Sequence, residues 1–324
     1  MAQLNMVQAL NQALMQEMEK DKAVMIMGED VAKDGGVFRV TEGLWSKFGE
    51  SRVVDTPLAE VAIVGTAIGL SIAGMKPICE VQFDGFTPPI FDQMLSHATK
   101  MRNRTRGKYT VHIVVRFPYG GGVRALEHHS ESPEAYFVHM PGVKVVIPSG
   151  PYDAKGLLIS AIRDPDPVIF MEPKKMYRAI KEEVPEESYS IPLGEAKTVQ
   201  EGEDMTIFAW GSMLHTSLEA AQAVKDKYSV EVVDLRTLSP LDIPAIEASV
   251  KKTGRVVIVH EAPKSCGVGA EIAAIINERE LLYLEAPIQR VTGYDTIVPL
   301  PKLEQYYFPN VERVTRAIEK VMSF

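Results

Sequence analysis

The sequence is poor in cysteine, in aromatic residues and in positive charge. Only Cys79 and Cys266 occur among 324 residues, and no CxxC motif is present. This scarcity excludes a disulfide framework and is typical of a reducing compartment, so we expect a cytoplasmic protein. A formal net charge of -8 and an aromatic content of 7% argue against a dedicated nucleic-acid binder, which is normally basic.

The segments that could insert into a membrane or direct secretion are also missing. The uncharged segment 61–75 is about 15 residues long, where a span needs roughly 20, and it contains three glycines. The first residues have no basic head before an apolar core, so we expect no signal peptide. They instead predict an amphipathic helix that begins with an Asn5–Gln8 capping box and buries Met6, Leu10, Leu14 and Met18.

Glu60 stands at the head of this uncharged segment. We expect a buried helix over 57–73, with Thr56 as its N-cap and Pro57 at its first position. One interpretation of Glu60 is a solvated first-turn glutamate favoured by the helix dipole. The other is a carboxyl group with little solvent, which exchanges a proton with a ligand nitrogen. The pattern alone leaves both open.

Short apolar runs and helical segments alternate along the chain. The first half predicts strands at 23–28, 51–54, 76–83, 111–117, 143–148 and 167–172, and helices at 57–73, 88–102, 132–139 and 151–163. The second half predicts strands at 205–210, 230–237, 255–262 and 287–293, and helices at 212–226, 243–252, 268–280 and 311–322. This alternation predicts an α/β fold with mostly parallel sheets. We expect one domain over 1–185, a linker over 186–195 and a second domain over 196–324.

Polar residues follow several of the predicted strands. Glu29, Glu60 and the glycine-led loop 118–130 come after predicted strands, Gln82 lies at the end of one, and Phe86 lies just beyond it. Ligands of open α/β sheets gather at the carboxyl ends of strands. We therefore expect the site at this edge of the first sheet.

Other motifs are weaker. His128 and His129 lack a third ligand at zinc spacing, so we expect one to act as an acid or base and the other to be structural. The glycines at 120–122 and 266–271 lack the full dinucleotide frame, but they keep a nucleotide-binding α/β protein open as an alternative. The basic run 100–108 has no interleaved aromatic residues and favours a solvated helix end.

Several longer stretches point to one family. They are GEDV (28–31), GGVFRVTEGL (35–44), VVDTPLAE (53–60), EVQF (80–83), HHSESPEAYFVHMPGVKVVIPS (128–149), YDAKGLL (152–158), DLRTLSPLD (234–242) and KTGR (252–255). Together they resemble the beta subunit of the thiamine-diphosphate-dependent decarboxylating component of 2-oxoacid dehydrogenase complexes. HSESPEAYF (129–137) and EAPIQRVTGYDT (285–296) resemble the branched-chain type more than the pyruvate type.

This resemblance implies a fold, a reaction and partners. The fold is an N-terminal thiamine-diphosphate pyrimidine-binding domain and a C-terminal transketolase-type α/β domain. The reaction is oxidative decarboxylation of a 2-oxoacid, with a branched-chain acid expected and a pyruvate dehydrogenase beta subunit as the alternative, followed by reductive acylation of lipoyl groups. The implied partners are an alpha subunit in an alpha2-beta2 heterotetramer and a dihydrolipoyl acyltransferase core, with no nucleic acid or membrane.

The resemblance also assigns cofactor positions. Glu60 would hydrogen-bond the ring nitrogen of the cofactor aminopyrimidine, and Leu58, Gln82 and Phe86 would line its pocket. Glu29 matches an acidic residue near the site, in a possible proton path. The Gly-Asp-Gly motif with its later Asn, which holds magnesium and diphosphate in this family, is absent. We therefore expect the alpha subunit to hold Mg²⁺ and the diphosphate.

Two further assignments follow the same resemblance. His129 matches a base associated with acyl transfer to lipoyl-lysine, whereas the role of His128 stays open. A structural potassium ion would be held by Ile113, Ala161, Ile162, Asp164 and Asp166. The family usually has Asn at the last of these positions, where this chain has Asp166.

Overall fold

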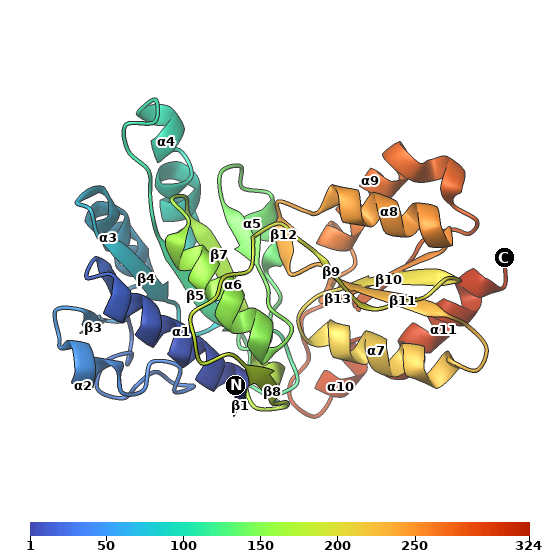
Figure 1. Cartoon of the computed structure of the whole chain (residues 1–324), viewed down its shortest axis with the longest axis horizontal. Helices are drawn as coiled ribbons and strands as arrows, with labels where there is room; N and C mark the ends of the chain where they lie inside the picture. The colour runs from blue at the N-terminus through green and yellow to red at the C-terminus, as the bar shows by residue number, and fades with distance from the viewer.

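The computed structural model describes residues 1–324, which form two α/β bodies that lie side by side (Figure 1). The first contains a seven-stranded sheet in the order β12-β6-β7-β5-β4-β2-β3, in which all neighbours are parallel except β12 and β6. The strands are β2 (Val24–Gly28), β3 (Val53–Asp55), β4 (Lys76–Glu80), β5 (Val114–Tyr119), β6 (Lys144–Val146), β7 (Val168–Pro173) and β12 (Thr237–Ser239).

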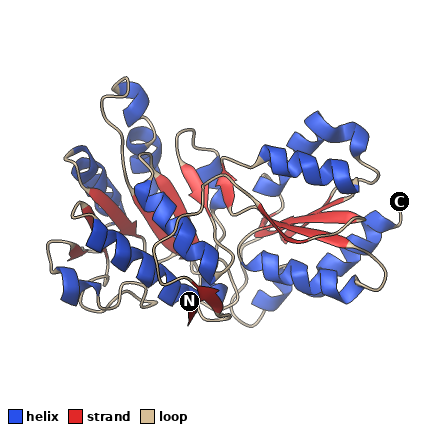
Figure 2. Ribbon diagram, in the orientation of Figure 1, coloured by secondary structure: helices blue, strands red, loops and turns tan.

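The second body contains a five-stranded sheet in the order β14-β13-β10-β11-β9, parallel except for β9. Its strands are β9 (Lys197–Gln200), β10 (Met205–Ala209), β11 (Val230–Asp234), β13 (Val256–Pro263) and β14 (Gln289–Gly293). The helices are α7 (Ser212–Val224), α8 (Ile243–Thr253), α9 (Val268–Glu280), η5 (Leu281–Tyr283), α10 (Glu304–Tyr307) and α11 (Val311–Met322). Figure 2 shows helices on both faces of this sheet, as expected where parallel strands alternate with helices.

The chain passes between the two bodies more than once. The short strand β12 lies in the second half of the sequence but pairs with β6 at the edge of the first sheet. A separate antiparallel pair joins β1 (Ala2–Leu4) to β8 (Glu182–Val184). The predicted division at 186–195 takes no account of this exchange and stays a prediction.

Helices cover both faces of the first sheet. On one face, α1 (Met6–Lys20) packs against α6 (Pro151–Arg163), and both contribute to one apolar core. The capping box of α1 is confirmed, and the four apolar residues predicted on its buried face are at most 1% exposed. On the other face lie α3 (Glu60–Ile72), α5 (Glu134–Val138) and a broken helical segment that begins at Asp84.

Two local predictions were wrong. The helix expected from Pro57 begins at Glu60, so its N-cap is Ala59 and not Thr56. The Thr56 N–H donates to Gly28 O (2.9 Å) and so continues the pairing of β3 with β2. The helix expected over 88–102 is interrupted. It consists of a 3-10 turn (Pro88–Ile90), a π-helical turn (Gln93–Ala98) and α4 (Met101–Arg104). The remaining short helices are α2 (Leu44–Phe48), η1 (Asp84–Phe86) and η4 (Lys174–Met176).

None of the helices combines the length and apolar character needed to cross a membrane.

Candidate functional site

The predicted cofactor residues meet at the carboxyl ends of β2, β3 and β4. Glu29 follows β2 and Glu60 begins α3, and the side chains of both are largely buried. Burial raises the pKa of Glu29, and the negative charges of Glu60 and Asp30 raise it further. Gln82 follows β4 and donates from Nε2 to Asp30 Oδ2 (3.0 Å). The structure thus gathers the acidic and amide groups at one sheet edge.

The environment of Glu60 bears on both interpretations of this residue. Its side chain is only 9% exposed, whereas a solvated first-turn glutamate would be open to water. No side-chain hydrogen bond of the structure involves its carboxylate, and Thr56 Oγ1, four residues earlier in the chain, is buried without a partner. Leu58, by contrast, is 77% exposed. Glu60 thus offers a carboxyl group without a hydrogen-bond partner, and Leu58 offers an exposed apolar side chain close by in the chain. Such a pair is compatible with one side of a binding site for a heteroaromatic ring.

Phe86 and His129 lie in one aromatic cluster with Phe83. The ring of His129 is 4.1 Å from Phe83 and 5.4 Å from Phe86, measured between centroids. Nδ1 of His129 lies 2.7 Å from Glu127 O, which can only accept, so Nδ1 carries the hydrogen. In the neutral ring this leaves Nε2 as an acceptor. His128, by contrast, has a left-handed backbone conformation (φ 63°) and is exposed.

A buried ion pair fixes the loop that carries the histidines. Asp84 and Lys174 form this pair, and neither side chain is exposed to solvent. Asp84 Oδ2 accepts from the Glu131 N–H (2.5 Å), and the Gly85 N–H donates to His128 O (3.1 Å). Burial raises the pKa of Asp84 to about 6 against the opposing effect of Lys174. Sequence reasoning missed this pair because its members are 90 residues apart and no motif joins them.

The glycine loop 120–122 binds protein groups rather than presenting its amides to solvent. The Gly121 N–H donates to Glu261 Oε2 (3.0 Å), and the Gly122 N–H donates to Glu304. Gly120 N–H donates to Glu131 O (2.8 Å). These donors are therefore already used, which weighs against a phosphate cradle and the nucleotide-binding alternative.

The second glycine motif is explained by packing. A Cβ atom added at Gly269 would lie 2.7 Å from His260 Nε2, and one at Gly267 would lie 2.8 Å from Pro263 O. Both glycines therefore allow the start of α9 to approach β13 closely.

Further buried charges lie beneath the site. Arg116 of β5 donates to both oxygens of Glu172 (2.7 Å each) and also pairs with Glu80. Glu134 of α5 is fully buried and neither oxygen has a hydrogen-bond partner. Burial raises the pKa of Glu134 to about 8, so this carboxyl group is mostly protonated at neutral pH.

A cavity of about 860 Å³ adjoins the histidine loop. Its lining comes from both halves of the chain and includes His128, Glu131, Tyr136, Ala262 and Cys266. The histidine loop thus forms part of the wall of a cavity that a second reactant could enter.

The five positions predicted to hold potassium lie together, but at the amino ends of β5 and β7, on the opposite edge of the sheet from Glu60. Protein donors already contact an oxygen of every one of these residues. The set therefore fits a potassium ion poorly. That assignment stays a prediction, and so do the roles of the other site residues.

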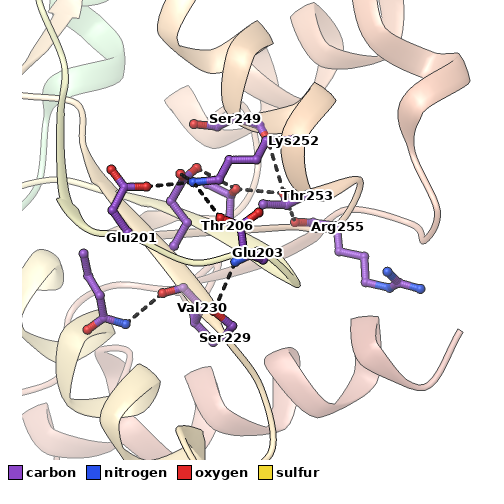
Figure 3. Close-up of polar contacts among 11 residues, drawn as sticks. Glu201, Glu203, Thr206, Ser229, Val230, Ser249, Lys252, Thr253 and Arg255 are labelled. Atoms are coloured by element: carbon purple, nitrogen blue, oxygen red, sulfur yellow. Dashed lines mark hydrogen bonds and ion pairs between the residues drawn. The ribbon is translucent and has the colours of Figure 1, made fainter.

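A second polar cluster lies in the C-terminal body (Figure 3). Lys252 Nζ contacts Glu201 (2.7 Å) and Glu231 (2.8 Å), and Thr206 Oγ1 donates to Glu231 (3.0 Å). This cluster is at the amino ends of β10 and β11, so it lies away from the edge where ligands of α/β sheets bind.

Comparison with known proteins identifies both halves. Residues 2–180 match the model "Transketolase, pyrimidine binding domain", and residues 194–314 match "Transketolase, C-terminal domain". A solved structure titled "Split gene transketolase, inactive beta4 tetramer" aligns with a TM-score of 0.82 over 99% of both chains. Its sequence identity is 20%, so it supports the fold alone. The predicted fold class is confirmed.

Close relatives carry one common name. The chain is 53% identical to "Pyruvate dehydrogenase E1 component subunit beta" of Acholeplasma laidlawii, over 99% of this chain and 98% of that protein. It is 50% identical to the protein of the same name from Bacillus subtilis and 49% identical to that from Staphylococcus epidermidis, over the full length of each chain. These names favour the pyruvate alternative over the branched-chain prediction.

Proposed function

The chain belongs to the family of E1 beta subunits of 2-oxoacid dehydrogenase complexes, and from this premise we propose that it forms the aminopyrimidine side of a thiamine diphosphate site in a pyruvate-decarboxylating enzyme. When bound, the cofactor would supply the electron sink for loss of carbon dioxide. The chain would supply Glu60, Leu58, Gln82 and Phe86 to bind and orient its pyrimidine ring.

The observation that carries the proposal is the isolation of Glu60. Glu60 as a whole is 9% exposed, its carboxyl group lacks a protein hydrogen bond, and Glu29 lies close enough to be affected by its charge. Such a group interacts strongly with one nitrogen of a heteroaromatic ring and can hold a proton there, because little water competes. The apolar core behind α3 maintains this exclusion of water.

The site would be completed by a second type of chain. The sequence lacks the magnesium and diphosphate motif, and Leu58, two residues before Glu60, is exposed on the surface of this chain. We therefore propose an alpha2-beta2 heterotetramer whose alpha subunit holds Mg²⁺ and the diphosphate. Both cysteines are free, which suits a reducing compartment, and we propose the cytoplasm.

Pyruvate is the proposed substrate, because the relatives of about half identity are named for it. The heterotetramer, purified after co-expression with its alpha partner, should turn over pyruvate faster than 3-methyl-2-oxobutanoate in an artificial-acceptor assay. A preference for the branched acid would restore the first prediction. Turnover by the beta chain alone would contradict the half-site.

Glu60→Gln tests the proposed proton contact. Hydrogen–deuterium exchange at the thiazolium carbon in the assembled enzyme should slow by about 10²–10⁴-fold, the usual range for general acid–base catalysis. The matched control is Glu312→Gln, because Glu312 is an exposed first-turn glutamate of α11. Equal exchange rates in the two variants would leave Glu60 with only a helix-dipole role.

His129 is proposed to act after decarboxylation. Its Nε2 is the ring nitrogen free to meet a reactant. The neighbouring His128 lines the cavity that would give space for a lipoyl arm from an acyltransferase core. His129→Ala should therefore lose lipoyl acylation far more than decarboxylation measured with an artificial acceptor. Equal losses in both assays would assign the histidine to cofactor binding or folding.

A further inference from the structure

The corner formed by the start of β5, the end of α6 and the start of β7 is crowded with hydrogen-bond donors. Ile113 O accepts from the Val168 N–H (3.0 Å), within the register of two parallel strands. Ala161 O accepts from the Asp164 N–H (3.3 Å), which ends the helix. Two of the five residues assigned to a monovalent cation thus have backbone partners.

His112 contacts Ile162, the next of the residues assigned to the cation. Its ring Nε2 lies 2.5 Å from Ile162 O, and since a carbonyl only accepts, Nε2 carries the hydrogen. The backbone of His112 is also held in place, because its N–H donates to Ser71 Oγ of α3 (2.7 Å). The imidazole therefore lies against an oxygen that a bound cation would have to share.

Two full positive charges complete the corner. Lys144 Nζ of β6 donates to Asp164 Oδ1 (2.8 Å), which also accepts from the Asp166 N–H (3.0 Å). Arg102 Nε of α4 donates to Asp166 Oδ1 (2.7 Å). The lysine–aspartate pair is the less exposed of the two, at 29% and 15% for its side chains. The charge that these carboxylates would offer to an ion is already neutralised.

We propose that His112, Lys144 and Arg102 take the place of a structural potassium ion, so that this corner of the protein is built without a metal. A potassium site needs several oxygens that together replace the hydration shell of the ion. Here an imidazole blocks one such oxygen, and a potassium ion would also face repulsion from the neighbouring ammonium and guanidinium groups.

The three side chains that replace the ion have a structural role. The three side chains come from the loop before β5, from β6 and from α4, and they contact the end of α6 and the turn that leads into β7. They therefore tie together elements that a single ion would otherwise join. Because the donors are covalent parts of the chain, this connection does not depend on which monovalent cation is present.

The test compares the thermal unfolding of the full chain and of the assembled enzyme in equal concentrations of KCl, NaCl and choline chloride. The wild type should unfold at the same temperature in all three salts, within about 1 °C. A resident potassium ion would instead raise the temperature selectively in KCl by about 3–8 °C, since binding to the folded state alone stabilises it. That selective rise would overturn the proposal.

Variants at His112 provide the converse experiment. His112→Ala exposes Ile162 O and should lower the unfolding temperature, with KCl restoring more of the loss than NaCl or choline chloride. His112→Gln keeps a donor at this position and should behave like the wild type. If His112→Ala unfolds like the wild type in every salt, the imidazole does not replace an ion. The wild-type comparison remains decisive if the alanine variant fails to fold.

Discussion

Two charged clusters, one around Arg116 in the first sheet and one around Lys252 in the second, lie at opposite ends of their strands. In the first sheet, Glu80 is the last residue of β4, and it pairs with Arg116 of β5. In the second, Thr206 and Glu231 are each the second residue of their strand, and Lys252 lies at the end of α8 (Figure 3). One cluster therefore lies at the carboxyl edge and the other at the amino edge.

The charged side chains of the two clusters also differ in how far they are exposed to solvent, and this difference follows from the role of each cluster. Arg116 is 1% exposed and Glu172 is fully buried, whereas Lys252 is 28% and Glu201 is 78% exposed. The carboxyl edge must present polar groups in a site that excludes water, so each buried charge needs an equally buried partner. The amino edge joins a helix end to two strands through a cluster that is buried at Glu231 (3% exposed) and open to water at Lys252 and Glu201.

The second sheet nevertheless contributes its carboxyl edge to the same site. Glu261 of β13 accepts from the Gly121 N–H and from Ser212 Oγ, so it fixes the glycine loop from the far side. The loop with His129 is thus fixed between the carboxyl edges of both sheets.

Removing the central cation of each cluster should give the largest contrast. Arg116→Met leaves Glu80 and Glu172 buried without a counter-charge and should lower the free energy of unfolding by about 3–5 kcal/mol. Lys252→Met should cost less, about 1–2 kcal/mol, because Lys252 is itself 28% exposed, although it leaves Glu231, at 3% exposure, without its counter-charge. Urea unfolding of the two variants measures the difference. Similar losses would mean that burial does not separate the clusters.

Removing one carboxylate should give a smaller contrast. Asp84→Asn leaves Lys174 buried beside a neutral group and should lower the free energy of unfolding by about 2–3 kcal/mol. It should also speed amide exchange across the loop 120–131, whose anchor is weakened. Glu201→Gln, a matched change at the exposed cluster, should stay within about 0.5 kcal/mol of the wild type. Unchanged loop exchange in Asp84→Asn would contradict its anchoring role.

The parts predicted correctly from the sequence are those fixed by local patterns. The helix α1 follows from the spacing of Met6, Leu10 and its neighbours, and the long parallel strands follow from their apolar runs. The strands β1, β8 and β12 have three residues each and pair with distant segments, so no local pattern predicts them.

The residues of the candidate site also divide into those that local motifs identify and those that only tertiary packing brings together. Motifs assign Glu60 and His129 by resemblance, and the strand order explains why Glu29 and Gln82 join Glu60 at one edge. The Asp84–Lys174 pair and the carboxylates on the glycine loop depend on tertiary packing. Sequence periodicity carries no information about such contacts.

A buried carboxyl group should make the stability of the site depend on pH. Burial raises the pKa of Glu134 to about 8, well above the value of about 4.3 in an unfolded chain. Between these values the folded state binds a proton that the unfolded state has lost, so the free energy of unfolding falls as the pH rises.

Glu134→Gln should therefore flatten the pH profile of unfolding. The slope between pH 5 and 8 should become less negative by about 1 kcal/mol per pH unit, up to the limit of about 1.4 for one proton. Glu203→Gln, which removes an exposed carboxylate next to Lys252, is the control and should leave the slope as it is. A wild-type slope in Glu134→Gln would show that another group controls the profile.

The smallest expected contrast lies between the caps of the first and last helices. Asn5 Oδ1 accepts from the Gln8 N–H (3.0 Å) while Gln8 Oε1 accepts from the Asn5 N–H (3.0 Å), whereas Asn310 only accepts from the Arg313 N–H (2.9 Å). Loss of an N-cap side chain costs about 1 kcal/mol. Asn5→Ala should lower the free energy of unfolding by a few tenths of that amount more than Asn310→Ala does, because the reciprocal bond of the capping box also loses its fixed partner. Gln8→Ala removes only the reciprocal bond and should be the mildest of the three in urea unfolding, so a larger loss in Gln8→Ala than in Asn5→Ala would reverse this order.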